Sequence, residues 1–200
     1  MAIPGSLKGR LLIALPALQD PNFDRTIVFL LHHDEEGAVG VVLNRPTRLE
    51  VADALPQWGP SVASPPVFFV GGPVGPSSAI CLARLRDGVG GGPDDGVDDG
   101  PDGPDDAWHP LIGGIGTVDL TRDPAEVAGE VESIRVFSGY AGWHGGQLED
   151  ELLAGAWLVT DALAGDALCA EPAGLWRTVL RRQPGSLSLL AWFPADLSLN

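Results

Sequence analysis

Short runs of aliphatic and β-branched residues, interrupted by turn residues, constrain most strongly how this 200-residue chain can fold. Runs of about four to eight such residues between turn residues are typical of strands. Most linkers between these runs are too short to hold a crossover helix, so neighbouring strands should be antiparallel. We expect six strands, at residues 11–15, 26–32, 39–43, 67–70, 79–85 and 114–120.

Four segments carry signals of helix formation. A capping box begins at Thr47, and Asp123 offers an N-cap followed by proline at the first helical position. Val131 and Ile134 then recur at helical spacing after Asp123, which predicts that this helix continues through them. The other two helices are expected at residues 147–153 and 172–182. Helices and strands alternate without a regular βαβ rhythm, which favours an α+β fold, mostly antiparallel, with about four helices.

The length of the chain indicates one domain over residues 1–200. No apolar run approaches the roughly 20 residues that cross a bilayer. The apolar stretch near the N-terminus is short and is interrupted at Pro16, so a first strand explains it better than a signal peptide. Cys81 and Cys169 lack metal-ligand spacing, which favours free thiols in a reducing cytoplasm.

The formal net charge of −15 disfavours direct binding to nucleic acid, because such a chain repels phosphate backbones. Eight aspartates lie in residues 87–107, among glycines and prolines and without a basic residue. This segment lacks the apolar surface that would offset its ordering entropy, so we expect a disordered loop. A calcium site is the alternative, but the spacing of an EF-hand loop is absent.

The segment DPNFDRT at residues 20–26 lies between two expected strands and is rich in polar turn residues. Asn22 and Arg25 could present hydrogen-bond donors to an anionic ligand, since arginine offers a bidentate fork. The same residue types also build turns whose side chains satisfy local amides. Both interpretations are open from the sequence.

The segment HHDEEGAVG at residues 32–40 places His33 beside Asp34, as an acid/base pair would require. Adjacent histidines on a strand point to opposite faces, so His32 and His33 are not expected to share a metal ion. A histidine that caps a hairpin loop explains the pattern equally well. No GxSxG motif or Cys/His signature of a nucleophile accompanies it.

The segment FSGYAGWHGGQLEDEL at residues 137–152 surrounds one histidine with four glycines and two large aromatic residues. Gly139 and Gly142 indicate a close approach of the main chain, either to a neighbouring strand or to a ligand. Tyr140 and Trp143 could flank such a ligand. Packing and a small-ligand or peptide site are both consistent with this composition.

Four segments together resemble one known family: LLIALPALQDPNFDRTIVFLLHHDEEGAVGVVLNRP, VGGPV, FSGYAGWHGGQLEDELLAGAWLV and FPADLSLN. Their ordered combination, from about residue 9 to residue 200, is similar to the YqgE/AlgH family of bacterial proteins, often labelled transcriptional regulators. The resemblance implies a compact α+β fold with a strongly curved sheet, cytoplasmic residence, no established cofactor and no agreed catalytic mechanism. The aspartate-rich segment departs from the family pattern and has the character of a surface-loop insertion. The matching positions are Asp20, Pro21, Asn22, Phe23, Arg25, His33, Gly37, Ala38, Gly40, Asn44, Pro46, Gly71, Gly72, Pro73, Ser138, Gly139, Tyr140, Gly142, Trp143, Gln147, Leu148, Glu149 and Trp157.

Our hypothesis from the sequence is that the three polar segments meet at one end of the sheet and form a shallow binding site. Tyr140 and Trp143 would be its walls, with main-chain approach at Gly139 and Gly142. The protein would then be a non-catalytic binding or regulatory module, without metal or cofactor, for a protein segment or a small anionic ligand. Its polar contacts would come from Asn22, Arg25, His33 and Gln147.

Two alternatives remain at this stage. The first is a hydrolase with Ser138 as nucleophile and His33 as base, paired with Asp34 or Glu149, which requires Ser138 Oγ and the His33 ring to form a hydrogen bond. The second is a DNA-binding regulator, which requires a contiguous basic face.

Overall fold

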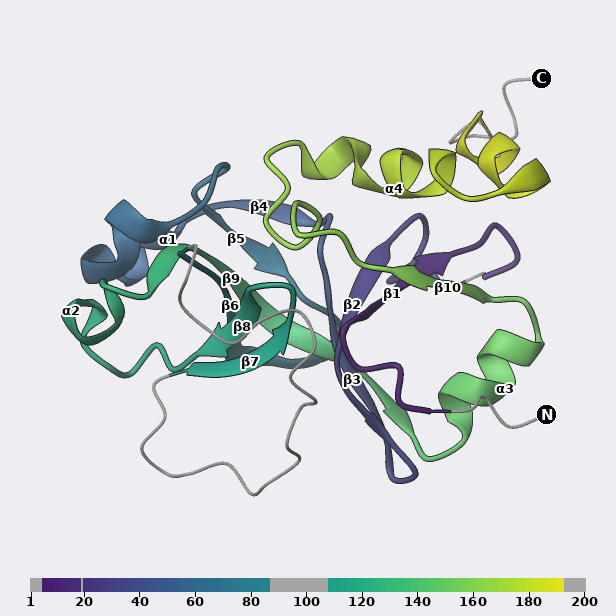
Figure 1. Cartoon of the computed structure of the whole chain (residues 1–200), viewed down its shortest axis with the longest axis horizontal. Helices are drawn as coiled ribbons and strands as arrows, with labels where there is room; N and C mark the ends of the chain where they lie inside the picture. Colours follow the sequence, from purple (N-terminus) through teal and green to yellow (C-terminus); the bar gives the residue numbers. More distant parts are fainter. Residues whose placement is uncertain (1–4, 19, 87–107, 193–200) are drawn as a thin grey trace.

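The computed structural model describes residues 5–18, 20–86 and 108–192 (Figure 1). The loop expected at 87–107 lies outside the described residues. The strands are β1 (Arg10–Ala14), β2 (Ile27–Asp34), β3 (Gly37–Val42), β4 (Pro46–Glu50), β5 (Val67–Val70), β6 (Val74–Leu85), β7 (Trp108–Ile112), β8 (Ile115–Val118), β9 (Val131–His144) and β10 (Trp157–Asp161). The α-helices are α1 (Val51–Ala54), α2 (Pro124–Val127), α3 (Gln147–Leu153) and α4 (Pro172–Arg181), and two 3₁₀ helices are η1 (Pro56–Ser61) and η2 (Gly185–Trp192).

The strands form one large curved sheet in the order β10-β1-β2-β3-β9-β6-β8-β7. Neighbours along this path are antiparallel, whereas β5 joins β9 in parallel and carries β4 on its other side. Strand β9 pairs with β6 through most of its length and with β3 through Ala141 to His144. The change of partner follows Gly139, which has a φ of +71°. The α+β class with a mostly antiparallel sheet, predicted from the sequence, is confirmed.

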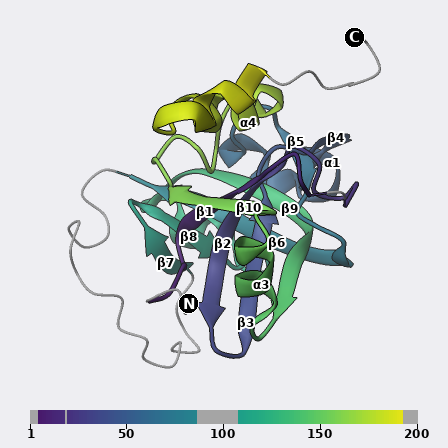
Figure 2. The same cartoon turned by 90° about the vertical axis from the view of Figure 1, so that its right-hand side faces the viewer.

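Helix α4 covers one face of the sheet beside β1 and β10, and α3 lies next to β3 and β9 (Figures 1 and 2). The amphipathic pattern of α4 buries Leu175, Trp176, Val179 and Leu180 in the main core cluster. Trp176 Nε1 also donates to the main-chain oxygen of Ala14 at 2.8 Å, which fixes α4 to the end of β1.

A second core cluster lies under α3 and joins Leu148 of that helix to side chains of the sheet. A third cluster lies in the half of the molecule that holds α1, η1 and α2, and it includes Val51, Trp58 and Val127. The sheet therefore has apolar side chains on both faces, so β1 and the first half of β2 are almost continuously buried.

The six strands expected from aliphatic runs correspond to β1, β2, β3, β5, β6 and β8, and the helices expected at 147–153 and 172–182 are α3 and α4. Two other helix predictions were wrong in extent. The capping-box residue Thr47 lies in strand β4, where its Oγ1 accepts a hydrogen bond from Leu49 N at 3.1 Å. The helix begins only at Val51 and is a single turn.

Asp123 caps a helix as predicted, since its carboxylate accepts from Ala125 N at 2.9 Å. That helix, α2, ends at Val127, and the residues Val131 and Ile134 belong to β9 instead. Pairing of β9 with β6 buries both side chains in the third cluster, so tertiary packing overrides their helical spacing.

Arg135 of β9 is a buried cation that ties three parts of the chain together. Its side chain lies over the ring of Phe69 at 4.3 Å and donates to the main-chain oxygens of Cys169 at 2.9 Å and Ser64 at 2.6 Å. Burial lowers the pKa of Arg135 to about 10, a value at which the guanidinium is still protonated at neutral pH. The arginine therefore fastens the segments that follow β10 and η1 to the centre of the sheet.

Candidate functional site

Of the glycines in the 137–152 segment, Gly139 lies where two segments of main chain cross. A Cβ atom on Gly71 would lie 2.2 Å from the Gly139 oxygen, and one on Gly139 would lie 2.6 Å from the Gly72 oxygen. Contacts this short leave no space for a side chain. Glycine is therefore required where β9 crosses the segment between β5 and β6. At Gly142 the nearest atom would be 3.5 Å away, in the ring of Tyr140, so a side chain there meets no such obstruction.

Trp143 belongs to the core rather than to the wall of a site. Its side chain stacks on Phe23 at a centroid distance of 6.2 Å and meets Trp157 edge-on at 5.9 Å. Its Nε1 donates to Glu151 Oε2 at 2.9 Å, and the residue is 7% exposed. Tyr140 is half-buried and packs against the main core cluster.

His33 is a buried link between the N-terminal segment and α3. Its Nδ1 accepts from Leu7 N at 3.1 Å, so the neutral ring carries its proton on Nε2, which faces Glu149 Oε1 at 2.9 Å. The carboxylate of Asp34 pairs with the other histidine, His32, at 2.8 Å. That bond and the amide of Glu36 hold the pKa of Asp34 below its ordinary value.

The Ser138–His33 pair of the hydrolase alternative is not formed. Ser138 Oγ donates to the Pro76 oxygen at 2.6 Å, while both ring nitrogens of His33 have the partners given above. Gln147 is also engaged in local structure, because it accepts from His144 N at 3.1 Å and donates to Glu151 at 2.9 Å.

The three segments predicted to meet do lie side by side, but buried side chains fill the space between them. Gly37 and Ala38 of the β2–β3 hairpin pair with His144 and Trp143 of β9. The turn at 20–26 reaches the same place through Phe23, whose ring stacks on Trp143. The part of the turn that carries Asn22 faces elsewhere.

A hollow of about 450 Å³ lies beside this turn. Its lining comes from three parts of the chain: the turn itself, the segment from the end of β3 to the start of β4, and the segment from the end of β5 towards β6. The lining residues are Pro21, Asn22, Val42, Asn44, Arg45, Pro46, Val70, Gly72 and Pro73. Asn22 is the one residue of the set predicted from the sequence that lines it.

Hydrogen bonds from Asn44 and Arg45 hold the turn in place. Asn44 is buried, donates to the Arg25 oxygen at 2.8 Å and accepts from Ile27 N at 3.0 Å. Arg45 donates to the main-chain oxygen of Asp24. Arg25 itself adopts a left-handed conformation, with a φ of 51°, and its guanidinium lies 5.1 Å from the centre of the Trp176 ring.

Main-chain hydrogen bonds hold the segment that contains Val70 and Gly71 in place. Val42 N donates to the Gly71 oxygen and Val70 N donates to the Arg45 oxygen, both at 2.8 Å. Gly71 N in turn donates to the Ser138 oxygen at 2.8 Å, which connects this segment to the crossing at Gly139. The hollow is thus built mostly on short turns and inter-strand segments, which hydrogen bonds to the sheet hold in place.

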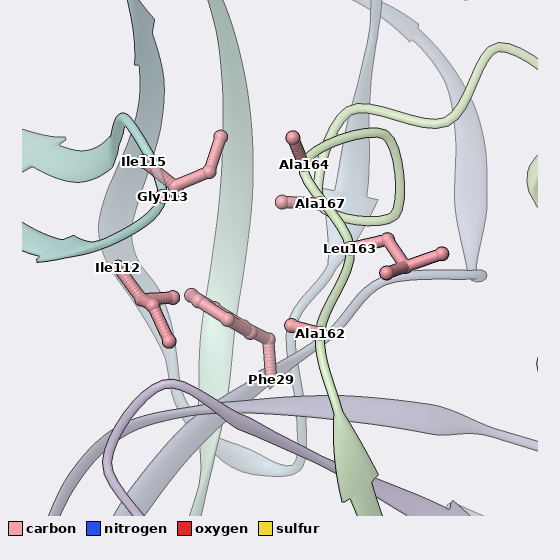
Figure 3. A pocket seen from close by; sticks show the side chains of 8 residues that line it. All are labelled: Phe29, Ile112, Gly113, Ile115, Ala162, Leu163, Ala164 and Ala167. Atoms are coloured by element: carbon pink, nitrogen blue, oxygen red, sulfur yellow. The ribbon is translucent and has the colours of Figure 1, made fainter. Parts of the chain in front are cut away.

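A second, much smaller gap of about 20 Å³ lies between β2, the β7–β8 hairpin and the chain after β10 (Figure 3). Side chains of Phe29, Ile112, Ile115 and Leu163 surround it, with no charged group among its lining residues. That volume has room for about one water molecule, so the gap is a packing defect rather than a ligand site.

The sequence pattern of the AlgH-like family matches residues 11–188 of the chain. The chain belongs to the AlgH-like family. A UPF0301 protein of Streptomyces avermitilis is 50% identical over 195 residues, which cover 98% of this chain and 96% of that protein. A UPF0301 protein of Streptomyces coelicolor is 49% identical over 195 residues, which again cover 98% of this chain and 96% of that protein. The YqgE/AlgH resemblance stated from the sequence is confirmed.

Two solved structures share the fold of this AlgH-like chain. A crystal structure of a protein from Corynebacterium diphtheriae has a TM-score of 0.83 at 30% identity and covers 96% of this chain and 95% of its own. The solution structure of the AlgH protein from Pseudomonas aeruginosa has a TM-score of 0.64 at 29% identity and covers 98% of each chain.

Within residues 5–18, 20–86 and 108–192, no three His, Cys, Asp or Glu side chains gather as metal ligands would. In the same part of the chain, no helix has both the length and the apolar character needed to cross a membrane.

Sequence reasoning missed Val42, Arg45 and Val70 as lining residues of the hollow. It gave Pro21, Asn44, Pro46, Gly72 and Pro73 as positions matching the family, without a role. The sequence signal that could have identified these residues as a group is the Asn-Arg-Pro run directly after β3. A polar pair at the end of a strand lies beside the loops that follow the neighbouring strands, and such loops often carry binding residues.

Proposed function

We propose that this AlgH-like protein is a non-catalytic binding module in the cytoplasm and that the hollow beside Asn22 is its ligand site. The observation that carries this proposal is the hollow itself. Its volume of about 450 Å³ falls within the range of roughly 300–1,000 Å³ that is usual for small-molecule sites. Any regulatory role would follow indirectly from occupation of this site.

The chemical character of the lining supports a small anionic ligand with an apolar part. Three prolines and Val70 offer apolar surface, and Val70 is 46% exposed. Asn22 and Arg45 add polar groups to the same hollow. Few polar groups within a mostly apolar concavity are typical of sites that bind and orient a small molecule.

The edge of β4 is a less suitable site for a protein segment that would add as a strand. Within the described chain β4 pairs with β5 alone. Pro46 has no N–H to donate, and the N–H of Leu49 is taken by Thr47 Oγ1. Both features reduce strand addition at this edge. We therefore favour a ligand that enters the hollow over a strand that extends the sheet.

Thermal unfolding against a panel of anionic metabolites tests this proposal, because a ligand that binds the native state raises the midpoint. We expect at least one compound to stabilise the wild-type protein. Val70→Trp places a large ring at the rim of the hollow and should abolish that shift.

Val74→Trp is the matched control, since Val74 is also exposed, at 39%, but does not line the hollow. Its shift should equal that of the wild type. Equal shifts in wild type and Val70→Trp would place the ligand elsewhere and would contradict the proposal.

A further inference from the structure

Arg45 carries a positive charge that no described carboxylate neutralises. Arg10, Arg122 and Arg182 form ion pairs with Asp161, Glu126 and Asp166. Within the described chain Arg48 and Arg177, like Arg45, form none, but of these three only Arg45 lines the hollow. An unpaired arginine in a hollow can bind a ligand that supplies the negative charge.

The guanidinium of Arg45 is also oriented in advance. One N–H donates to the main-chain oxygen of Asp24, while a guanidinium has five N–H donors in a rigid fork. The remaining donors have no partner among the described residues. Because one bond already limits rotation of the side chain, less side-chain entropy is lost when an anion binds.

The side-chain amide of Asn22 adds a second hydrogen-bond donor that is available to a ligand. Its side chain is exposed in the hollow and has no hydrogen bond within the described chain, although its main-chain N–H donates to Asp20 at 2.8 Å. The amide of Asn44 differs, since it donates to Arg25 in the turn and accepts from Ile27 at the start of β2. Arg45 and Asn22 are thus available to a ligand, and Asn44 supports them.

We infer that the ligand of the hollow carries a carboxylate, bound by Arg45 and Asn22, and an apolar body that packs on Val70 and the neighbouring prolines. This inference rests on the proposed function. The planar fork of arginine matches a carboxylate in two parallel hydrogen bonds. The same fork also binds phosphate, but the strong negative charge of the chain opposes a dianion more than a monoanion.

The carboxylate has two possible sources, a free small acid or the C-terminus of a peptide. NMR titration of the ¹⁵N-labelled protein with phenylacetate, its neutral counterpart phenylacetamide and inorganic phosphate tests the chemistry. A tripeptide Ala-Ala-Phe, with its C-terminus either free or amidated, tests the source. We expect phenylacetate to shift the amide signals of residues that line the hollow and to bind at least about tenfold more tightly than phenylacetamide.

Arg45→Gln should remove this preference for the acid over the amide. Arg48→Gln, an exposed arginine on β4 that does not line the hollow, should retain it. Because Arg45 also holds the turn, Asn22→Ala provides a second variant at an exposed position, and it should weaken binding of phenylacetate without weakening binding of phenylacetamide. Tighter binding of the free peptide than of phenylacetate identifies a peptide terminus as the source, and the reverse order identifies a small acid.

Equal affinities of phenylacetate and phenylacetamide at the hollow would overturn the carboxylate inference and leave the hollow as a site. Tighter binding of phosphate would overturn it in the same way. Absence of any shift at the hollow, with every probe, would overturn the proposed function together with this inference.

Discussion

Gly71 and Gly139 meet where two segments of main chain cross, and this contact leaves no space for a methyl group. Gly71→Ala should therefore destabilise the protein by about 2 kcal/mol or more, because the chain must move apart to admit the Cβ atom. Chemical denaturation measures the change. Gly174 of α4 is the control, since nothing lies within 4 Å of its Cβ position, and Gly174→Ala should stabilise the helix by up to about 1 kcal/mol. Equal stability of Gly71→Ala and wild type would contradict the crossing.

The two cysteines should differ in reactivity. Burial raises the pKa of the Cys81 thiol to about 12, so almost no thiolate is present near pH 8, whereas Cys169 is half-buried. A colorimetric thiol reagent should modify Cys169 in the native protein and Cys81 only in denaturant. Cys81→Ser should leave the native signal unchanged. Rapid reaction of two thiols per native chain would show that Cys81 is accessible.

The sequence identified which residues are unusual but not what they touch. Both interpretations of Gly139 were open because its partners, Gly71 and Gly72, lie far away in the chain. Trp143 and His33 have the same appearance in the sequence whether they line a site or pack in a core. Their burial depends on Phe23, Glu149 and Glu151, which tertiary structure alone brings to them.

At the scale of elements, one carboxylate joins α3 to the two strands beside it. Glu151 Oε2 accepts from Trp143 Nε1 of β9 at 2.9 Å and from Trp157 Nε1 of β10 at 2.7 Å. Glu151→Ala leaves two indole N–H groups without a partner and should destabilise the protein by about 2–5 kcal/mol. Asp150→Ala, an exposed neighbour, should change stability by less than about 1 kcal/mol. Near-ultraviolet circular dichroism should report the altered tryptophan environment, and similar stability of both variants would refute this role.

Elements defined by local signals were predictable, and elements defined by pairing were not. The apolar face and proline of α4 are sufficient to predict that helix. The chain around Val131 carries helical spacing and nevertheless forms β9, because β6 supplies a complete set of pairing partners. Thr47 likewise has a capping-box pattern but bonds two residues ahead, at Leu49, within a strand that β5 pairs.

For the whole molecule, Arg135 is the connection that links distant segments through the centre of the sheet. Arg135→Met keeps much of the side-chain volume but removes the donors to the oxygens of Cys169 and Ser64. We expect a loss of about 3 kcal/mol or more, since hydrogen bonds from charged groups are strong and the carbonyls are left unsatisfied. Arg177→Met, on the exposed face of α4, is the control and should stay within about 0.5 kcal/mol. A similar midpoint of urea unfolding for both variants would contradict the role of Arg135.

The candidate site arises only at this largest scale. Its lining comes from three separate parts of the chain, near residues 21, 45 and 72, and no local pattern shows that they surround one hollow. The sequence did predict the α+β class and the family. Asn22, a candidate contact from the sequence, lines the hollow, but its role there stays a prediction. It directed attention to Tyr140 and Trp143 because large aromatic residues beside glycines are typical of both sites and cores.

A crystal structure of the protein with the most stabilising compound of the metabolite panel would test the central claim most directly. Difference density for the compound should lie between Asn22, Arg45 and Val70, with its charged group at the guanidinium. Density beside Tyr140, Trp143 and Gln147, or on another face of the molecule, would contradict the assignment of the hollow as the binding site.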